Sequence, residues 1–513
     1  MQTTPNDNAG FFESLCEEYQ KHNHIDPEYY ARWGVKRGLR NADGTGVLAG
    51  VTQIGNVLGY YVQDGERYPM DGKLIYRGID VEELINGFVG EGRFGFEETA
   101  YLLLFGVLPT REQLENFNHI LSENHTLPKM FTEDMIIKAP SPDVMNKLAR
   151  SVLALYSYDD NPDDLSLANQ LRQAVQLIAR VPVIVAHAFA VKRHYYDDES
   201  LYLHRPQPGL SVAQNFLYSV RHDNQFTEQE ARLLDLCLVL HAEHGGGNNS
   251  AFACRVLSSS NTDIYSSIAA AVGSLKGPRH GGANKKVMEM FHHIEDEVKD
   301  WKDDDEVRAY LGKLLRKEAG DRSGLIYGMG HAIYTLSDPR AVLLKRFARQ
   351  LAETKGMVDQ FELLESVERL TPGVLVDVKG EKKVVCANID LYSGFVYQMM
   401  GIPEELYTPL FAVARMVGWC AHRIEEVTSP ANRIIRPAYK GGPPTPPFVP
   451  RPRPYPPITL FFPRPGPGAP GRRSSYWAAM RSARSLRYSQ RSIFSSRAAS
   501  SCPCSSWSFW RAR

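Results

Sequence analysis

Four segments of the chain place a histidine or an aspartate beside glycine-rich turns, a combination that can bind and polarise a small anionic substrate. The first, residues 240–250, reads LHAEHGGGNNS and contains His244. Three glycines end a helix and leave its last carbonyls and the amides of the loop close to any ligand. A plain helix stop is the simpler interpretation of this segment alone, and the order HxEH is not the HExxH of a metalloprotease.

The second segment, residues 277–284 (GPRHGGAN), puts His280 just before a helix that is expected to begin near Asn284. The positive end of a helix dipole lowers the pKa of a nearby imidazole and keeps it neutral. A neutral ring is suited to donate a hydrogen bond to a carbonyl oxygen. An ordinary turn without chemical function is the alternative.

The third segment, residues 327–334 (YGMGHAIY), contains His331 and leads into SDPR, which ends at Arg340. Its small residues allow the backbone to approach a nucleotide-like ligand closely, although GxGH is not the GxGxxG fingerprint. The guanidinium of Arg340 offers a planar fork for a carboxylate.

The fourth segment, residues 387–394 (ANIDLYSG), places Asp390 in an apolar stretch. There the pKa of a carboxyl group rises, and the group can act as a base toward a carbon acid. A helix N-cap is the alternative role. Arg415 (FAVARMVGW) and Arg436 (RIIRPAY) also lie in apolar surroundings and need an anionic partner, which is either a structural carboxylate or a substrate.

Long helices and a little β structure must position these residues. Apolar residues recur every three or four positions in two series, which are Met145, Leu148, Val152 and Leu155, then Leu171, Val175, Ile178 and Val181. Runs of β-branched and aromatic residues between Thr45 and Tyr76 predict a small strand-rich piece, and residues 374–390 (VLVDVKGEKKVVCANID) predict a second hairpin. We expect a mainly α-helical protein with minor β structure near the N-terminus.

The chain has 513 residues with 59 basic and 59 acidic side chains, but this balance conceals two unlike parts. Residues 441–513 contain 12 arginines, 14 prolines and 13 serines but no lysine or acid, so residues 1–440 carry a formal charge of −12. An acidic body argues against nonspecific nucleic-acid binding by that part. The tail has no apolar periodicity and is predicted to be disordered. It is either an interaction arm for nucleic acid or anionic lipid or an out-of-frame end without function, and we favour the second.

Seven scattered cysteines without a CxxC pair predict a reduced, cytoplasmic protein, and their spacing does not suit a metal. The first twenty residues lack the basic and apolar regions of a secretory signal. The most apolar stretch, residues 181–191, is shorter than the ~20 residues needed to cross a bilayer, so no membrane span is expected.

Together, the four segments occur in a fixed order, with intervals of 36, 51 and 59 residues separating His244, His280, His331 and Asp390. With the flanking LIYRGIDVEELI and FEETAYLLLFGVLPTREQL, the sequence resembles the citrate synthase family over roughly residues 46–440. GPxHGxAN combined with GxGHxxYxxxDPR is highly specific to that family. The resemblance implies a two-domain helical fold, expected here as an N-terminal extension (1–45), a large domain in two parts (46–281 and 392–440), a small domain (282–391) and the tail (441–513).

The resemblance implies an acyltransferase of the tricarboxylic acid cycle that condenses acetyl-CoA with oxaloacetate and hydrolyses citryl-CoA to citrate and CoA. Asp390 then removes a methyl proton from acetyl-CoA, His280 stabilises the enol, and His331 polarises the ketone of oxaloacetate. The implied oxaloacetate-binding residues are His244, Asn248, Arg340, Arg415 and Arg436. Arg436 matches an arginine that the second subunit contributes, so a homodimer is expected.

CoA is implied as a co-substrate rather than a permanently bound cofactor, and no metal is required. The loop before His331 is implied to hold it, through Leu325, Gly328, Met329 and Gly330. Thr335 departs from the family, in which a basic residue commonly serves CoA phosphate there, and leaves Lys345 or Arg346 as substitutes.

Two other functions remain open from the sequence. A 2-methylcitrate synthase would use propionyl-CoA, and the extra methyl group is worth only about 1–3 kcal/mol in an apolar pocket. A noncatalytic protein that binds CoA or nucleic acid belongs to another class, but such a protein has no need of the base Asp390.

Overall fold

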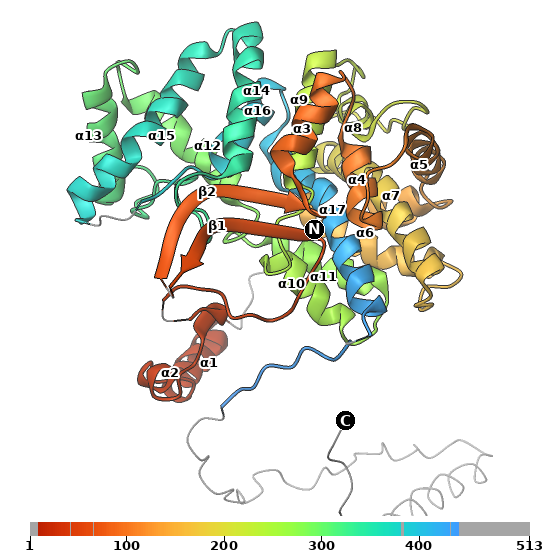
Figure 1. Cartoon of the computed structure of the whole chain (residues 1–513), viewed down its shortest axis with the longest axis horizontal. Coiled ribbons are helices and arrows are strands. Elements are labelled where there is room, and N and C mark those ends of the chain that lie inside the picture. Colours follow the sequence, from red (N-terminus) through yellow and green to blue (C-terminus); the bar gives the residue numbers. More distant parts are fainter. Residues whose placement is uncertain (1–8, 42, 65, 381–383, 431, 441–513) are drawn as a thin grey trace, which may run out of the picture. The chain divides into compact units, whose positions relative to one another are not determined.

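The computed structural model describes residues 9–440, apart from residues 42, 65, 381–383 and 431. The predicted disorder of residues 441–513 therefore concerns residues outside the described part. Helices make up most of the described chain, and its three strands lie toward the N-terminal end (Figure 1). The prediction of a mainly α-helical fold with minor β structure near the N-terminus is confirmed.

The chain begins with two helices and a small antiparallel sheet, in which β2 lies between β1 and β3. The bounds are α1 (Ala9–His22), α2 (Glu28–Arg32), β1 (Gly55–Gln63), β2 (Glu66–Tyr76) and β3 (Ile79–Asp80), with a short 3-10 turn at Arg37–Leu39. Strands β1 and β2 form a long hairpin in which Gly55 pairs with Tyr76. The strand-rich piece predicted between Thr45 and Tyr76 is this hairpin.

A series of helices follows the sheet. These are α3 (Val81–Gly90), α4 (Phe96–Phe105), α5 (Arg111–Asn124), α6 (Val144–Ala154), α7 (Leu167–Tyr196), α8 (Val212–Val220), α9 (Glu228–His241), α10 (Asn249–Ser258) and α11 (Ile264–Lys276). A π-helical turn at Thr132–Ile137 precedes α6, and a 3-10 turn at Leu155–Tyr158 follows it. Both predicted helical series fall in this region, on α6 with its following turn and on α7.

The rest of the described chain is also helical. It comprises α12 (Ala283–Glu297), α13 (Asp304–Leu315), α14 (Pro339–Lys355), α15 (Val358–Lys379), α16 (Asp390–Met399), a 3-10 turn (Glu404–Leu406) and α17 (Tyr407–Thr428). In Figure 1, α12, α13 and α15 gather on one side, and α4–α8 gather on the other. Helix α17 runs through the second group, where it packs against α4, α7, α9, α10 and α11.

Helix α7 is the one described helix that is long and apolar enough to cross a membrane, and 78% of its apolar window is buried inside the protein. Such burial is typical of the core helix of a globular fold, because a membrane span exposes its apolar face to lipid.

The hairpin predicted at residues 374–390 is wrong. Helix α15 continues to Lys379, so the first valine-rich run is its last two turns. Val374 is buried there, and α15 packs against α13 and α14. Packing against neighbouring helices outweighs the weak preference of valine for strands. Within the described residues, the later run contributes only an isolated bridge between Ala387 and Met329.

Candidate functional site

The site is centred on Arg415, which α17 buries completely. Its Nε donates to the carbonyl of His241 at 2.6 Å, and its guanidinium lies 4.7 Å from the centre of the Phe411 ring. Both Nη atoms are buried without a hydrogen-bond partner. Burial lowers the pKa of Arg415 to about 10, so the group remains a cation at neutral pH. A buried cation with two free donors is suited to bind an anion.

The charge of Arg415 reaches the other predicted site residues. Burial is the largest cause of the pKa shifts of His244, His280 and Asp390. The charge of Arg415 adds to the lowering of the two histidine pKa values and opposes the rise of the pKa of Asp390. Arg340 acts on His244 and Asp390 in the same way. The structure therefore brings together residues that are separated by up to 171 positions in the sequence.

His331 lies against His244 and Tyr334. The rings of His244 and His331 meet edge to face with 5.2 Å between their centres, and Tyr334 stacks on His331 at 4.5 Å. Nδ1 of His331 accepts hydrogen bonds from the backbone N–H groups of Ile333 (3.1 Å) and Tyr334 (3.0 Å). Because Nδ1 accepts, the ring proton is on Nε2. Burial, followed by Arg340, lowers the pKa of His331 to about 4, so a neutral Nε2–H donor is available.

Arg340 already has a carboxylate partner. Its Nε and Nη2 donate to Asp338 at 3.0 and 2.7 Å, and both side chains are buried. Asp338 also caps α14 by accepting from the backbone N–H of Arg340 at 3.0 Å. The fork predicted for a substrate carboxylate is thus largely occupied by Asp338. Arg340 adds positive charge to the site and has only Nη1 outside this pair.

The β1–β2 hairpin fixes the loop that carries His331. The backbone N–H of Gly72 donates to Ser337 Oγ at 3.1 Å, and Thr335 Oγ1 donates to the carbonyl of Gly59 at 3.4 Å. A Cβ on Gly59 would lie 2.5 Å from the carbonyl oxygen of Ile333, and one on Gly72 would lie 2.2 Å from that of Ser337. Only glycine permits this close backbone approach.

His280 lies just before α12, which begins at Ala283, as predicted. Its Nε2 is 3.0 Å from Ser250 Oγ, which donates to Asn248 Oδ1 at 2.9 Å and accepts from Trp419 Nε1 at 3.2 Å. Burial and then Arg415 lower the pKa of His280 to about 4. The predicted direction of the shift holds, but its cause was misassigned, because burial rather than the helix terminus dominates.

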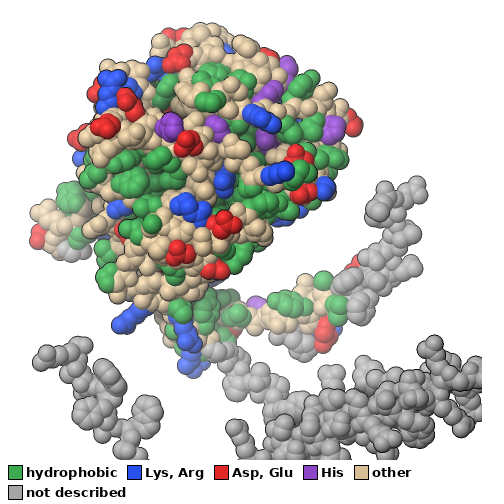
Figure 2. Space-filling model, turned by 90° about the vertical axis from the view of Figure 1, so that its right-hand side faces the viewer, with side chains coloured by type: hydrophobic (Ala, Val, Ile, Leu, Met, Phe, Trp, Pro, Cys, Tyr) green, Lys and Arg blue, Asp and Glu red, His purple; other side chains and the backbone are tan. Residues whose placement is uncertain are grey.

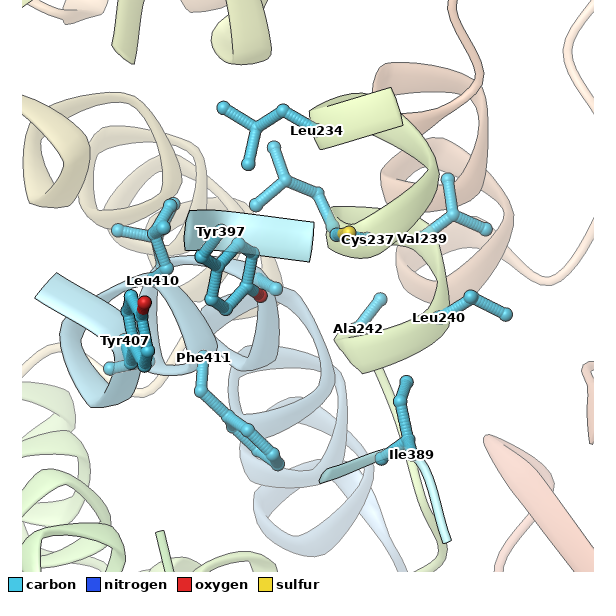
Figure 3. Packing of buried hydrophobic residues seen from close by; sticks show 14 of the residues in the cluster. Leu234, Cys237, Val239, Leu240, Ala242, Ile389, Tyr397, Tyr407, Leu410 and Phe411 are labelled. Carbon is cyan, nitrogen blue, oxygen red and sulfur yellow. The ribbon is translucent and has the colours of Figure 1, made fainter. Parts of the chain in front are cut away.

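Asp390 is the first residue of α16, and its side chain does not cap that helix, whose N-cap position is Ile389. Burial raises the pKa of Asp390 to about 6 against the opposing charges of Arg340 and Arg415. The packed apolar side chains of Ile389, Leu240 and Phe411 lie around the start of this helix (Figure 3). A carboxyl group with this pKa is ionised at neutral pH and can accept a proton.

The glycine-rich loop before His331 lies beside the start of α16. Met329 pairs with Ala387, and Leu325 is half exposed at the other end of the loop. Neither of the cations suggested for CoA phosphate is free, since Lys345 pairs with Glu368 at 2.8 Å and Arg346 with Glu82 at 3.2 Å.

Arg436 is exposed in the segment after α17 and is not brought to this site by its own chain. The neighbouring Ile435 donates its backbone N–H to Ser259 Oγ at 3.0 Å, beyond the C-terminal end of α10. Asn248 lies at the opposite end of that helix.

A buried charged network behind His244 was not predicted from the sequence. Glu243 Oε1 accepts from the backbone N–H of Gly245 at 2.5 Å and from His422 Nε2 at 2.9 Å. Arg255 donates to His422 Nδ1 at 2.7 Å, so the ring proton of His422 is on Nε2. Burial raises the pKa of Glu243, but His422 and Arg415 more than offset this and bring it below its ordinary value. His422 follows Arg415 by seven positions, a spacing that places both on one face of a helix.

The histidines of the described chain do not gather into a metal site. No group of three or more His, Cys, Asp or Glu side chains among the described residues could hold a metal ion. The face in Figure 2 shows histidines spread over the surface among apolar and charged side chains.

Comparisons with known proteins agree with this fold. The family described as "Citrate synthase, C-terminal domain" matches residues 41–438. A citrate synthase of Synechocystis is 36% identical over 378 residues, which cover 72% of this chain and 84% of that one. A solved structure of the citrate synthase of Thermoplasma acidophilum, in complex with carboxymethyl coenzyme A and oxaloacetate, is also similar. It superposes with a TM-score of 0.66 at 27% sequence identity, and the match covers 81% of this chain and 98% of the Thermoplasma chain.

A 2-methylcitrate synthase of Shewanella oneidensis is also similar, with 32% identity over 71% of this chain and 87% of that protein. The matches as a group define an enzyme that transfers acyl groups. The chain belongs to the citrate synthase family.

Proposed function

We propose that this protein is a citrate synthase of the tricarboxylic acid cycle, which condenses acetyl-CoA with oxaloacetate and hydrolyses citryl-CoA to citrate and CoA. The family uses these two substrates. The residues that we assign to the reaction itself are His280, His331 and Asp390.

Enolisation of acetyl-CoA is the first step. Asp390, whose pKa of about 6 makes it an ionised base at neutral pH, removes a proton from the methyl group. The methyl group of a thioester is a weak acid, so the charge that develops on the thioester oxygen needs a donor. Neutral His280 supplies this hydrogen bond, for which its ring must exchange the contact with Ser250 for one with the substrate.

Carbon–carbon bond formation follows. The enol carbon attacks the ketone carbon of oxaloacetate, while His331 Nε2–H donates a hydrogen bond to the ketone oxygen and stabilises the charge that develops there. The proton released in the enolisation step ends on this oxygen, which becomes the hydroxyl group of citryl-CoA. Water then cleaves the thioester bond of citryl-CoA and releases the CoA thiol. The backbone bonds to His331 Nδ1 support this role, because they keep the proton on the nitrogen that must donate it.

Oxaloacetate carries two carboxylates and needs several donors in a site shielded from water. We assign its binding to His244, Asn248, Arg340, Arg415 and, from the second subunit of a homodimer, Arg436. Arg415 is the strongest part of this assignment, because its two free Nη atoms are buried. Arg340 contributes mainly through its charge, since Asp338 holds most of its donors. Exposed Arg436 is available to a partner chain.

CoA is assigned to the loop that contains Leu325, Gly328, Met329 and Gly330. We further propose that residues 282–391 form a small domain that closes over the substrates against a large domain made of residues 46–281 and 392–440. Closure would exclude water until condensation is complete.

The single observation that carries this proposal is a completely buried Arg415 with two unpaired Nη atoms, whose charge acts on His280 and on the base Asp390. The direct test is the release of free CoA thiol, measured with oxaloacetate and either acetyl-CoA or propionyl-CoA. We expect acetyl-CoA to give the higher kcat/KM. Thiol release that does not depend on oxaloacetate would contradict the assignment.

A 2-methylcitrate synthase is the second candidate, and the similarity to the Shewanella enzyme supports it. The same residues would perform the same chemistry on an acyl group that is one methyl group larger. A higher kcat/KM with propionyl-CoA in the thiol assay would favour this candidate and leave every residue assignment unchanged.

A further inference from the structure

The segment that carries the proposed base Asp390 and the proposed CoA loop are joined by backbone hydrogen bonds. The backbone N–H of Gly330 donates to the carbonyl of Cys386 at 2.7 Å, and that of Asn388 donates to the carbonyl of Gly328 at 2.9 Å. Gly328 has a φ of 78°, and a Cβ there would lie 2.8 Å from the Cα of Leu391. The loop therefore approaches the start of α16 more closely than a side chain at this position would allow.

The side chain of Asn388 uses both ends of its amide at this junction. Nδ2 donates to the carbonyl of Gly330 at 2.9 Å, and Oδ1 accepts from the backbone N–H of Asp390 at 2.9 Å. Gly330 directly precedes His331. The side-chain amide of Asn388 therefore holds the backbone next to His331 and the backbone of Asp390. The role requires a donor and an acceptor on one short side chain, which an ionised aspartate or an alanine does not provide.

We propose that Asn388 is a positioning residue that fixes the distance between Asp390 and His331 and couples both to the CoA loop. This inference rests on the proposed function and extends it to a residue that contacts neither substrate in that mechanism. Within the described residues, the Asp390 carboxylate accepts no hydrogen bond, so its direction depends on the backbone that Asn388 holds. A misplacement of about 1 Å between reacting groups costs about 10²-fold in rate.

The test compares Asn388→Ala with Asn215→Ala. The side chain of Asn215 makes an equivalent set of hydrogen bonds. Its Nδ2 donates to the carbonyls of Gln207 and Leu210, and its Oδ1 accepts from the backbone N–H of Gln207. Asn215 is far along the chain from the reacting residues. We expect Asn388→Ala to lower kcat by about 10²-fold and to raise the KM for acetyl-CoA by about tenfold. The KM for oxaloacetate should stay nearly unchanged, since Asn388 is not bonded to Arg415 or His244. Asn215→Ala should leave all three values nearly unchanged.

Asn388→Asp is a second variant of the same shape, which keeps the test valid if the alanine variant does not fold. It retains the acceptor for Asp390 N–H but loses the donor to Gly330. Its added negative charge raises the pKa of Asp390, so the acidic limb of the kcat profile should move to higher pH. A residue with a merely structural role would lower the melting temperature but leave kcat and the KM for acetyl-CoA close to those of Asn215→Ala.

Three outcomes separate the possibilities. Kinetic constants of both Asn388 variants within about twofold of wild type would overturn the inference and leave the proposed function intact. Equal increases in the KM values of the two substrates, with kcat unchanged, would also overturn it. If the wild-type protein releases no thiol from either acyl-CoA, the proposed function itself fails, and the inference fails with it.

Discussion

The two walls of the site are held together by different forces. We call the first the α9–α17 wall; it comprises His244, Glu243, Arg415 and His422. A partly buried chain of charged groups runs behind it, in which Arg255 joins buried His422 to Glu425 and Glu426. We call the second the α16 wall, which comprises residues 325–330 and 386–390. Backbone bonds and the amide of Asn388 hold it together.

This difference matches the two ligands that we assign to the walls. A small dianion is bound best by charges that are fixed before it arrives, since buried donors then lose little freedom on binding. Removing one member of a chain of buried charges leaves the charge of its partner uncompensated, so a substitution in the α9–α17 wall is expected to destabilise the protein. The α16 wall depends on bonds made by glycine-rich backbone, and such segments open at lower free energy than a packed core.

Asp390→Asn should have the largest effect of the changes considered, because it removes the base and preserves the shape of the side chain. We expect kcat to fall by about 10³-fold, within the range that a positioned base contributes. Oxaloacetate should still bind with nearly wild-type affinity, because its proposed ligands lie mainly on the other wall. Thiol release measures the first effect, and calorimetry with oxaloacetate alone measures the second.

A parallel loss of oxaloacetate affinity in Asp390→Asn would show that the two walls are not independent. Turnover close to that of wild type would refute the assignment of the base.

Arg415→Gln should produce the complementary result on the α9–α17 wall. Loss of a charged donor pair is expected to weaken oxaloacetate binding by about 10²-fold, since a hydrogen bond to a charged group contributes about 1.5–3 kcal/mol. Calorimetry with oxaloacetate tests this directly. Lys440→Gln is a suitable control, because it removes one positive charge that lies over the Trp33 ring, outside the site.

Unchanged oxaloacetate affinity in Arg415→Gln would mean that the free Nη atoms serve another ligand. If acetyl-CoA binding alone were weakened, the assignment of ligands to the two walls would have to be reversed.

The sequence predicts the reactive side chains of the site but not the contacts behind them. The segments around His244, His280, His331 and Asp390 are local patterns, and residue type with spacing is enough to find them. The causes of the pKa shift of His280 are burial and then the charge of Arg415, and they are not local, since Arg415 follows His280 by 135 positions. The Glu243–His422 pair joins residues 179 positions apart, and nothing in either segment indicates the partner.

Two interpretations from the sequence leave out tertiary partners, and the structure contradicts the first of them. Residues 374–378 favour a strand by composition, but α13 and α14 provide a surface on which they pack as helix α15. Lys345 and Arg346 were suggested for CoA phosphate from position alone, and each is paired with an acid from elsewhere in the chain, Glu368 on α15 and Glu82 on α3. Tertiary packing decides the first case, while the suggestion for CoA phosphate stays a prediction.

The pH dependence of turnover should show the smallest effect, about tenfold per pH unit on one side of the profile. Asp390 acts as a base only when ionised, and its pKa is about 6, so kcat/KM for acetyl-CoA should be full above that pH and fall below it. His280 and His331, with pKa values of about 4, stay neutral throughout this range and add no second limb. Arg415 lowers the pKa of Asp390, so in Arg415→Gln, assayed at saturating oxaloacetate, the limb should move to higher pH. A limb that stays in place in this variant would show that the charge of one wall does not reach the base on the other.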